Sequence, residues 1–293
     1  MKPSHGKISI CIVKEMIYMA IEVFNRYEKK YLINGENFKW FMEKLKEHMK
    51  PDKYNKDGKL YNISNIYYDT PDDALIRASI EKPVYKEKLR LRSYGVPGIC
   101  DEVFLEIKKK YNGMVNKRRT CLKLKEAYAL VNNGIKPEEA SCINKQVLEE
   151  IRYFLKIYTL VPKVYLTYDR MAFFDREDDD FRVTFDTNIR TRRYDVGLEK
   201  GGYGELLIGN DIWLMEVKSS KAIPLWFTRL LEERDIKAVS FSKYGTEYKK
   251  YIIEKYNKNE SKNIKIKGDL LCFHQCLQEQ KLQEYQPKGQ LSA

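Results

Sequence analysis

The chain has 293 residues, 43% of them hydrophobic, so it can bury a core without metal or disulfide staples. Its 54 Lys and Arg residues exceed its 42 Asp and Glu residues, and the formal charge of +12 favours an anionic partner such as nucleic acid, acidic lipid or polyphosphate. Six scattered cysteines argue against a disulfide framework, and three histidines argue against a His-centred triad or a His-based zinc site. No segment has the roughly 18–20 uninterrupted apolar residues of a membrane span, so we expect a cytoplasmic protein without one.

Residues 1–20 form an N-terminal extension to which no pattern assigns a structure. The first predicted strand, Phe24–Ile33, has charged residues on one face, because side chains alternate along a strand. These residues are Arg26, Glu28 and Lys30. A helix is predicted over Glu36–Lys50, where apolar residues recur at helical spacing.

The next three predicted strands repeat this arrangement. In the strand Lys86–Tyr94, Leu89 and Leu91 face one way and the basic residues face the other. A second strand covers Val103–Lys110, and a third surrounds Lys117. The charged residues on the corresponding faces of these strands are Lys86, Lys88, Arg90, Arg92, Glu106, Lys108, Lys110, Lys117 and Arg119.

The second half of the predicted domain alternates helices with two further charged strands. One strand holds Arg182, Thr184, Asp186 and Asn188 opposite Val183 and Phe185, and the other holds Glu216 and Lys218 opposite Met215 and Val217. The glycines of Gly197–Gly209 indicate a flexible hairpin connection between these strands. The predicted helices are Leu122–Asn133, Pro137–Tyr158, Pro224–Arg234 and Ser242–Lys255.

No Pro-, Gly- or Ser-rich linker and no internal repeat divides residues 21–257, which predicts one domain. Residues 258–293 are rich in Lys, Asn, Gln and Glu and are predicted to form a weakly ordered tail. A solvated outer face would explain one charged strand, but the amphipathic helices need an apolar sheet surface to cover. The charged faces must then meet one another. We therefore predict an α+β fold, a closed antiparallel β-tunnel of about eight strands with a charged lumen and helices outside.

An enclosed surface with so many cations requires an anionic ligand, because unpaired enclosed charges cost several kcal/mol each. Duplex nucleic acid is too wide for a small barrel, and binders of single strands interleave aromatic residues that are almost absent from these faces. A triphosphate or linear polyphosphate therefore fits best. No G-x-x-x-x-G-K-[ST] motif is present, which excludes a P-loop.

The carboxylates on the charged faces have two explanations. They can hold Mg²⁺ or Mn²⁺, which favour carboxylate oxygens and shared phosphate ligands, or form ion pairs with neighbouring Lys and Arg. The residues concerned are Glu28, Glu106, Asp186 and Glu216. Glu216 is the foremost metal candidate.

Nine short motifs follow one another in order between Phe24 and Lys255. They are Phe24-Asn-Arg26-Tyr-Glu28-Lys-Lys30-Tyr31, Tyr67-Tyr-Asp69-Thr, Leu89-Arg90-Leu-Arg92-Ser-Tyr94-Gly95, Leu105-Glu106-Ile-Lys108, Asn116-Lys117-Arg-Arg119, Tyr168-Asp-Arg170-Met-Ala-Phe173, Arg182-Val-Thr-Phe-Asp186-Thr187, Met215-Glu216-Val-Lys218 and Phe241-Ser242-Lys243-Tyr244. Together they resemble the VTC domain, a polyphosphate polymerase family within the triphosphate tunnel (CYTH-like) superfamily.

This resemblance implies a tunnel fold that transfers the terminal phosphate of ATP to a polyphosphate chain with Mn²⁺ or Mg²⁺. It implies catalytic roles for Arg90, Arg92, Lys108, Arg170 and Arg182. It implies substrate or phosphate binding by Arg26, Lys30, Lys117, Arg119, Lys218, Ser242 and Lys243. Glu216 would be the metal ligand, with Glu28 and Glu106 as further candidates.

Two features depart from the fungal pattern. Ser240 stands where the fungal family has a Lys before Phe-Ser-Lys, and the chain carries neither the phosphate-sensing SPX module nor the membrane helices of the fungal complexes. We therefore expect a stand-alone domain of bacterial type. A triphosphatase that uses water as acceptor, a non-catalytic sensor of polyphosphate or inositol phosphate, and a nucleic-acid binder remain as alternatives. The carboxylates weigh against the sensor.

Overall fold

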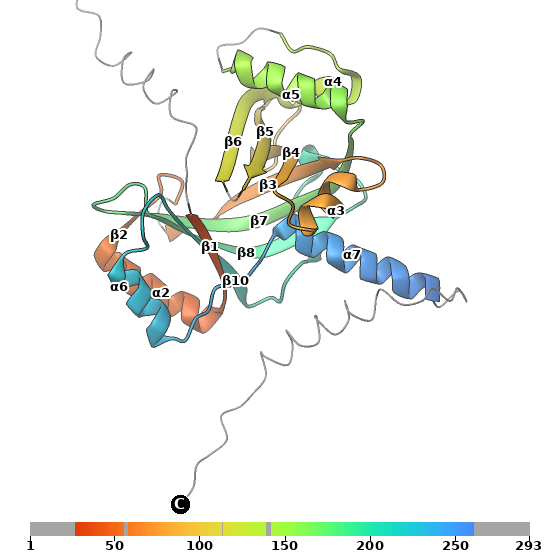
Figure 1. The fold of residues 1–293 in the computed structure, drawn as a ribbon. Helices are drawn as coiled ribbons and strands as arrows, with labels where there is room; N and C mark the ends of the chain where they lie inside the picture. Colours follow the sequence, from red (N-terminus) through yellow and green to blue (C-terminus); the bar gives the residue numbers. More distant parts are fainter. Residues whose placement is uncertain (1–26, 56–57, 113, 139–141, 261–293) are drawn as a thin grey trace, which may run out of the picture. The chain divides into compact units, whose positions relative to one another are not determined.

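The computed structural model describes residues 27–55, 58–112, 114–138 and 142–260, which form an α+β fold with a ten-stranded antiparallel sheet (Figure 1). The strands are β1 (Tyr27–Asn34), β2 (Met49–Pro51), β3 (Tyr61–Asp69), β4 (Tyr85–Tyr94), β5 (Glu102–Tyr111), β6 (Met114–Lys123), β7 (Val161–Asp175), β8 (Arg182–Arg192), β9 (Glu205–Leu206) and β10 (Ile212–Ser219). The helices in the described residues are α2 (Gly35–His48), α3 (Ala74–Ile80), α4 (Leu124–Asn133), α5 (Lys145–Ile157), α6 (Leu225–Glu233) and α7 (Lys243–Glu260).

The described residues up to Tyr248 belong to one compact unit and those from Lys249 to a second, with the division inside α7. The predicted extension at 1–20 and the tail beyond Glu260 lie outside the described residues, so the predicted domain boundaries stay predictions. No helix in the described ranges is long and apolar enough to cross a membrane.

The main path of the sheet contains eight strands in the order β1-β10-β8-β7-β3-β4-β5-β6, while β2 pairs with β7 and β9 pairs with β8. The antiparallel pairing of the prediction is therefore confirmed. The sheet has ten strands, eight of them on the main path, where about eight were predicted. No hydrogen-bonded ladder joins β1 to β6 within the described residues, so the two ends of the sheet are not paired. Closure of the tunnel through hydrogen bonds is not confirmed.

One hydrophobic core lies between α4, α5 and the outer face of β4, β5 and β6. Leu89 and Leu91 of β4 are fully buried in it, together with Ile151 and Phe154 of α5. Gly134 ends α4 in the left-handed conformation (φ 69°), as its position after the apolar repeat predicts. This core uses the apolar face that strand alternation assigned to the helices (Figure 1).

A second core lies between α2, α6 and the outer face of β1, β8 and β10 (Figure 1). Phe185 of β8 and Met215 of β10 are fully buried against Phe41 of α2 and Phe227 of α6. The helices therefore cover the apolar strand faces, as predicted. We call the opposite face of the sheet the inner face.

Charged residues from strands that are far apart in the sheet order interact electrostatically on the inner face. Lys108 of β5 and Glu28 of β1 each affect the pKa of the other, although their strands belong to opposite parts of the sheet order. The charged faces thus approach each other, which the sequence argument required.

Two helices differ from the prediction. Helix α5 begins at Lys145 and not at Pro137, because the Asn144 side chain accepts a hydrogen bond from the Val147 amide (3.1 Å) and caps the helix there. Helix α3 was not predicted. Its first turn is held by Asp69, whose carboxylate accepts hydrogen bonds from the amides of Leu75 and Ile76, both at 2.9 Å.

Candidate functional site

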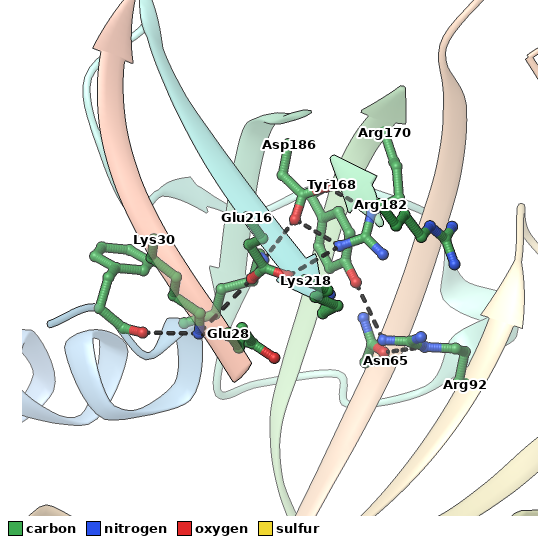
Figure 2. Close-up of polar contacts among 12 residues, drawn as sticks. Glu28, Lys30, Asn65, Arg92, Tyr168, Arg170, Arg182, Asp186, Glu216 and Lys218 are labelled. Atoms are coloured by element: carbon green, nitrogen blue, oxygen red, sulfur yellow. Dashed lines mark hydrogen bonds and ion pairs between the residues drawn. The ribbon is translucent and has the colours of Figure 1, made fainter. Parts of the chain in front are cut away.

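Two buried carboxylates, Asp186 and Glu216, lie beside Arg170 and Lys218 (Figure 2). With Lys243 these residues form what we call the Asp186–Glu216 cluster. Arg170 of β7 donates two hydrogen bonds to Asp186 of β8, at 2.6 and 2.8 Å. Lys243, the first residue of α7, donates to Asp186 at 2.5 Å and to Glu216 at 3.1 Å. Lys218 donates to the other Glu216 oxygen at 3.0 Å. Three strands and the start of one helix therefore meet at this point.

Lys30 extends the cluster to the edge strand β1 (Figure 2). Its Nζ lies 3.0 Å from a Glu28 oxygen and 3.7 Å from Glu216 Oε1. The same ammonium donates a hydrogen bond to the backbone oxygen of Phe241 at 2.9 Å. Lys30 thereby fixes the segment that leads into α7 against β1.

Both carboxylates of the cluster are ionised at neutral pH. Burial opposes the ionisation of Glu216, but Lys243, Lys218 and Lys30 outweigh it and hold the pKa of Glu216 well below its ordinary value. Burial likewise opposes ionisation of Asp186, and Arg170 with Lys243 lowers its pKa. The cluster is therefore a network of full charges.

The donor set of this cluster fits only one kind of metal site. Both Glu216 oxygens already accept hydrogen bonds, one from Lys243 and one from Lys218. Within the described residues, no three inner-face carboxylates approach within 4.8 Å as a ready-made cage would require. Mg²⁺ and Mn²⁺ commonly bind one or two carboxylates together with substrate phosphate oxygens. The residues thus form no ready-made metal site but fit a cation that is shared with a phosphate, and the role of Glu216 as its ligand stays a prediction.

A third buried carboxylate, Glu106 of β5, lies among cations from its own hairpin and the neighbouring strand β4. Arg90 Nε is 2.6 Å away, Lys117 Nζ is 2.8 Å away and Arg92 Nε is 3.9 Å away. Burial opposes ionisation, yet these cations hold the pKa of Glu106 well below its ordinary value. The ion-pair explanation accounts for Glu106, whereas a metal role for it stays a prediction.

Tyr168 of β7 connects the Asp186–Glu216 cluster with the cations around Glu106. Its hydroxyl accepts a hydrogen bond from Arg92 at 3.1 Å, and its ring faces Lys243 Nζ at 4.6 Å. Arg92 also donates to Asn65 Oδ1 of β3 at 2.9 Å (Figure 2). The sequence argument did not single out Tyr168 or Asn65. The one available signal for Tyr168 was its place in the Tyr-Asp-Arg motif.

Lys88 is half-buried and Lys108 is exposed, and neither has a carboxylate within 4.0 Å among the described residues. The same holds for Lys86, Lys110 and Arg119, which lie further along the charged faces. Burial, together with neighbouring lysines, lowers the pKa of Lys88 to about 8. Partial desolvation also lowers the pKa of Lys108, against the attraction of Glu28. A desolvated ammonium without a counter-ion is stabilised when an anion binds beside it.

The remaining predicted site residues make other contacts. Arg182 pairs with Asp52 at 3.1 Å, and Arg119 is exposed with its guanidinium 4.7 Å from the Phe104 ring centre. The Ser242 hydroxyl accepts a hydrogen bond from the Gly245 amide at 3.2 Å, which caps the start of α7. Asn188 leaves the alternation, because it is exposed with φ 50° and donates to Asp169. Arg26 lies outside the described residues.

The family model of the VTC domain matches residues 25–252. Subunit 4 of the vacuolar transporter chaperone complex from Trypanosoma cruzi is 25% identical over 272 residues, and that from Trypanosoma brucei brucei is 25% identical over 269 residues. Each alignment covers 76% of this chain and 34% of the relative, so the chain spans about a third of the length of these relatives.

Solved structures that match this chain include an adenylate cyclase candidate from Bacillus halodurans, at 17% identity and a TM-score of 0.47 over 76% of this chain and 96% of that one. An adenylyl cyclase candidate from Hippeastrum with a dominant triphosphatase activity has 16% identity and a TM-score of 0.42. The latter match covers 74% of this chain and 92% of that one.

Proposed function

The chain belongs to the VTC domain family, and we propose that its inner face transfers the terminal phosphoryl group of ATP to the end of a polyphosphate chain. In this reaction a terminal oxygen of the chain attacks the γ-phosphorus. The bond from that phosphorus to the bridging oxygen breaks, and its electron pair leaves with ADP. Such a transfer depends on positioning and charge neutralisation and needs no protein nucleophile.

The observation that carries this proposal is the surplus of cations on the inner face, which includes the half-buried Lys88 and the exposed Lys108. Arg90 and Lys117 are matched with Glu106, and Lys243 is matched with Asp186 and Glu216, whereas Lys88 and Lys108 have no carboxylate within 4.0 Å in the described chain. A linear polyanion between the two charged halves of the inner face would supply the missing counter-ions. We further propose that the curved sheet encloses this polyanion as a tunnel.

The proposed roles follow from the positions of the cations. Arg90, Arg92 and Arg170 would hold phosphate oxygens through their guanidinium forks, and Lys88, Lys108 and Lys243 would neutralise charge along the chain. Lys30, Lys117, Lys218 and the more peripheral Arg119 and Arg182 would guide substrate or product. Mn²⁺ or Mg²⁺ bound by Glu216 and phosphate oxygens would supply further charge neutralisation.

The test is incubation of the purified protein with γ-labelled ATP and Mn²⁺, followed by separation of the products on a gel. We expect a ladder of labelled polyphosphate, absent from Glu216→Ala and Arg90→Ala variants. Lys29→Ala is the matched control, because Lys29 is exposed on the strand that carries Lys30. Free phosphate without a ladder would assign a triphosphatase instead. Retained polyphosphate binding without turnover would assign a binding module.

A further inference from the structure

Three side chains with metal-binding atoms meet at the far end of the β5–β6 hairpin, away from the Asp186–Glu216 cluster. They are Glu102 of β5, Cys121 of β6 and Cys142 from the segment before α5. A carboxylate oxygen and the two sulfur atoms all lie within 4.8 Å of one another. In the described residues this is the one such group of three.

The hairpin register explains how two of these residues come together. Cys121 is the cross-strand partner of Phe104, and Glu102 is the partner of Lys123. Glu102 therefore lies diagonally opposite Cys121 on the same face of the hairpin, within reach of a longer side chain. No change in the strands is needed to bring the carboxylate to the thiol.

The third residue is held by contacts with β6. The amide of Asn144 donates to Thr120 Oγ1 at 3.0 Å, and the Cys142 thiol lies 3.8 Å from the backbone oxygen of Cys121. Cys121 is 7% exposed, whereas Glu102 and Cys142 are exposed, so a cation can enter from solvent. The site is thus preassembled and accessible.

We propose that Glu102, Cys121 and Cys142 bind one Zn²⁺ ion, which fastens the segment before α5 to the β5–β6 hairpin. Two thiolates and a carboxylate are suitable zinc ligands, and a tetrahedral ion with Zn–S bonds of about 2.3 Å leaves its fourth position to water. The thiolates select against Mg²⁺ and Mn²⁺, which prefer oxygen ligands. This site is therefore chemically distinct from the one proposed at Glu216.

The experiment measures the zinc content of the full chain after chelator treatment, incubation with Zn²⁺ under thiol-free anaerobic conditions and removal of unbound metal. Wild type, Cys142→Ser and Cys100→Ser are compared. Cys100 is the control because it is an exposed free cysteine outside the group. The measured quantity is the difference in zinc content between variants, so any metal bound by Cys11, Cys272 or Cys276 cancels.

We expect Cys142→Ser to bind one equivalent of Zn²⁺ less than wild type, and Cys100→Ser to bind the same amount as wild type. With Co²⁺ as the probe, the thiolate charge-transfer absorption should weaken in Cys142→Ser and Cys121→Ser. A Glu216→Ala variant should keep the full zinc content, which separates this site from the proposed active site. Equal zinc content in wild type and Cys142→Ser would overturn the proposal. So would a Cys121–Cys142 disulfide in protein kept under reducing conditions throughout.

Discussion

The ammonium of Lys243 lies 3.1 Å from Glu216 Oε1, although the residues are 27 positions apart and belong to a helix and a strand. The same ammonium is 2.5 Å from Asp186. Burial opposes the charge on Lys243, but Asp186 and Glu216 outweigh it and raise its pKa. The first residue of α7 therefore completes a site that is otherwise built from the sheet.

Replacement of Lys243 by Met should destabilise the protein as well as stop the reaction. The change leaves Glu216 and Asp186 buried with fewer cations, and loss of one partner of a buried ion pair costs about 3–5 kcal/mol. Because Arg170 still binds Asp186, we expect the free energy of unfolding, measured in urea, to fall by about 3 kcal/mol. Lys237→Met is the control, since the Lys237 side chain is 82% exposed. A loss of stability no larger than that of the control would contradict the proposed ion-pair network around Lys243.

Metal dependence should distinguish Glu216 from Glu106. Glu216→Gln should raise the Mn²⁺ concentration for half-maximal activity by about 10-fold or more, because it removes the proposed protein ligand. Glu106→Gln should leave that concentration within about twofold and lower stability, since Arg90 and Lys117 lose their counter-ion. Titration of both variants with Mn²⁺ measures this. The assignment is wrong if Glu106→Gln changes the metal requirement as much as Glu216→Gln does.

The charge on Lys88 should destabilise the ligand-free protein in a defined pH range. Its folded pKa of about 8 lies below its ordinary value of 10.5, so the unfolded chain binds more protons between these values. This destabilisation is fully present below about pH 8 and decreases as the pH rises towards 10.5. Lys88→Met should therefore stabilise the free protein at pH 7, by up to about 3 kcal/mol, and by less at pH 10.

The same substitution should weaken polyphosphate binding. Wild type should bind polyphosphate less tightly at pH 9 than at pH 7, because Lys88 must take up a proton to neutralise the ligand. Calorimetry in buffers of different ionisation enthalpy measures that proton uptake. Lys29→Met is the control for binding and stability. If Lys88→Met binds as tightly as wild type, Lys88 does not face the ligand.

Tyr244 should position Lys243 through a buried hydrogen bond. Its hydroxyl donates to Asp69 at 3.0 Å, and its ring stacks on Tyr67 at 4.7 Å. Tyr244→Phe keeps the stacking and removes the hydrogen bond, so we expect a loss of about 1–3 kcal/mol in thermal unfolding. Turnover should fall more than polyphosphate affinity does. An unchanged turnover with reduced stability would limit Tyr244 to a structural role.

Strand alternation predicted much of the inner face correctly. The rule placed Leu89 and Leu91 in the core and Arg90 on the opposite face, and the burial of both leucines confirms it. The pairing of Arg90 with Glu106 and of Lys218 with Glu216 agrees with the ion-pair alternative. These contacts were predictable because they lie within one strand or between neighbours in a hairpin.

Long-range features could not be predicted in the same way. The β3–β4 register brings Asn65 to Arg92, and a register shift between β7 and β8 at Thr167 and Asp169 takes Asn188 out of the alternation of β8. The alternation of side chains within one strand predicts neither feature. The connection after β8 was predicted to be flexible, but Arg192 donates hydrogen bonds to four backbone oxygens there.

The most direct test of the proposed function follows the fate of the γ-phosphate by ³¹P nuclear magnetic resonance during turnover of ATP with Mn²⁺ and a short polyphosphate primer. We predict that each ADP formed is accompanied by one additional phosphate inside the chain, seen as growth of the internal-phosphate resonance. Growth of the orthophosphate resonance in equal amount, with the internal resonance unchanged, would contradict polymerisation and identify water as the acceptor.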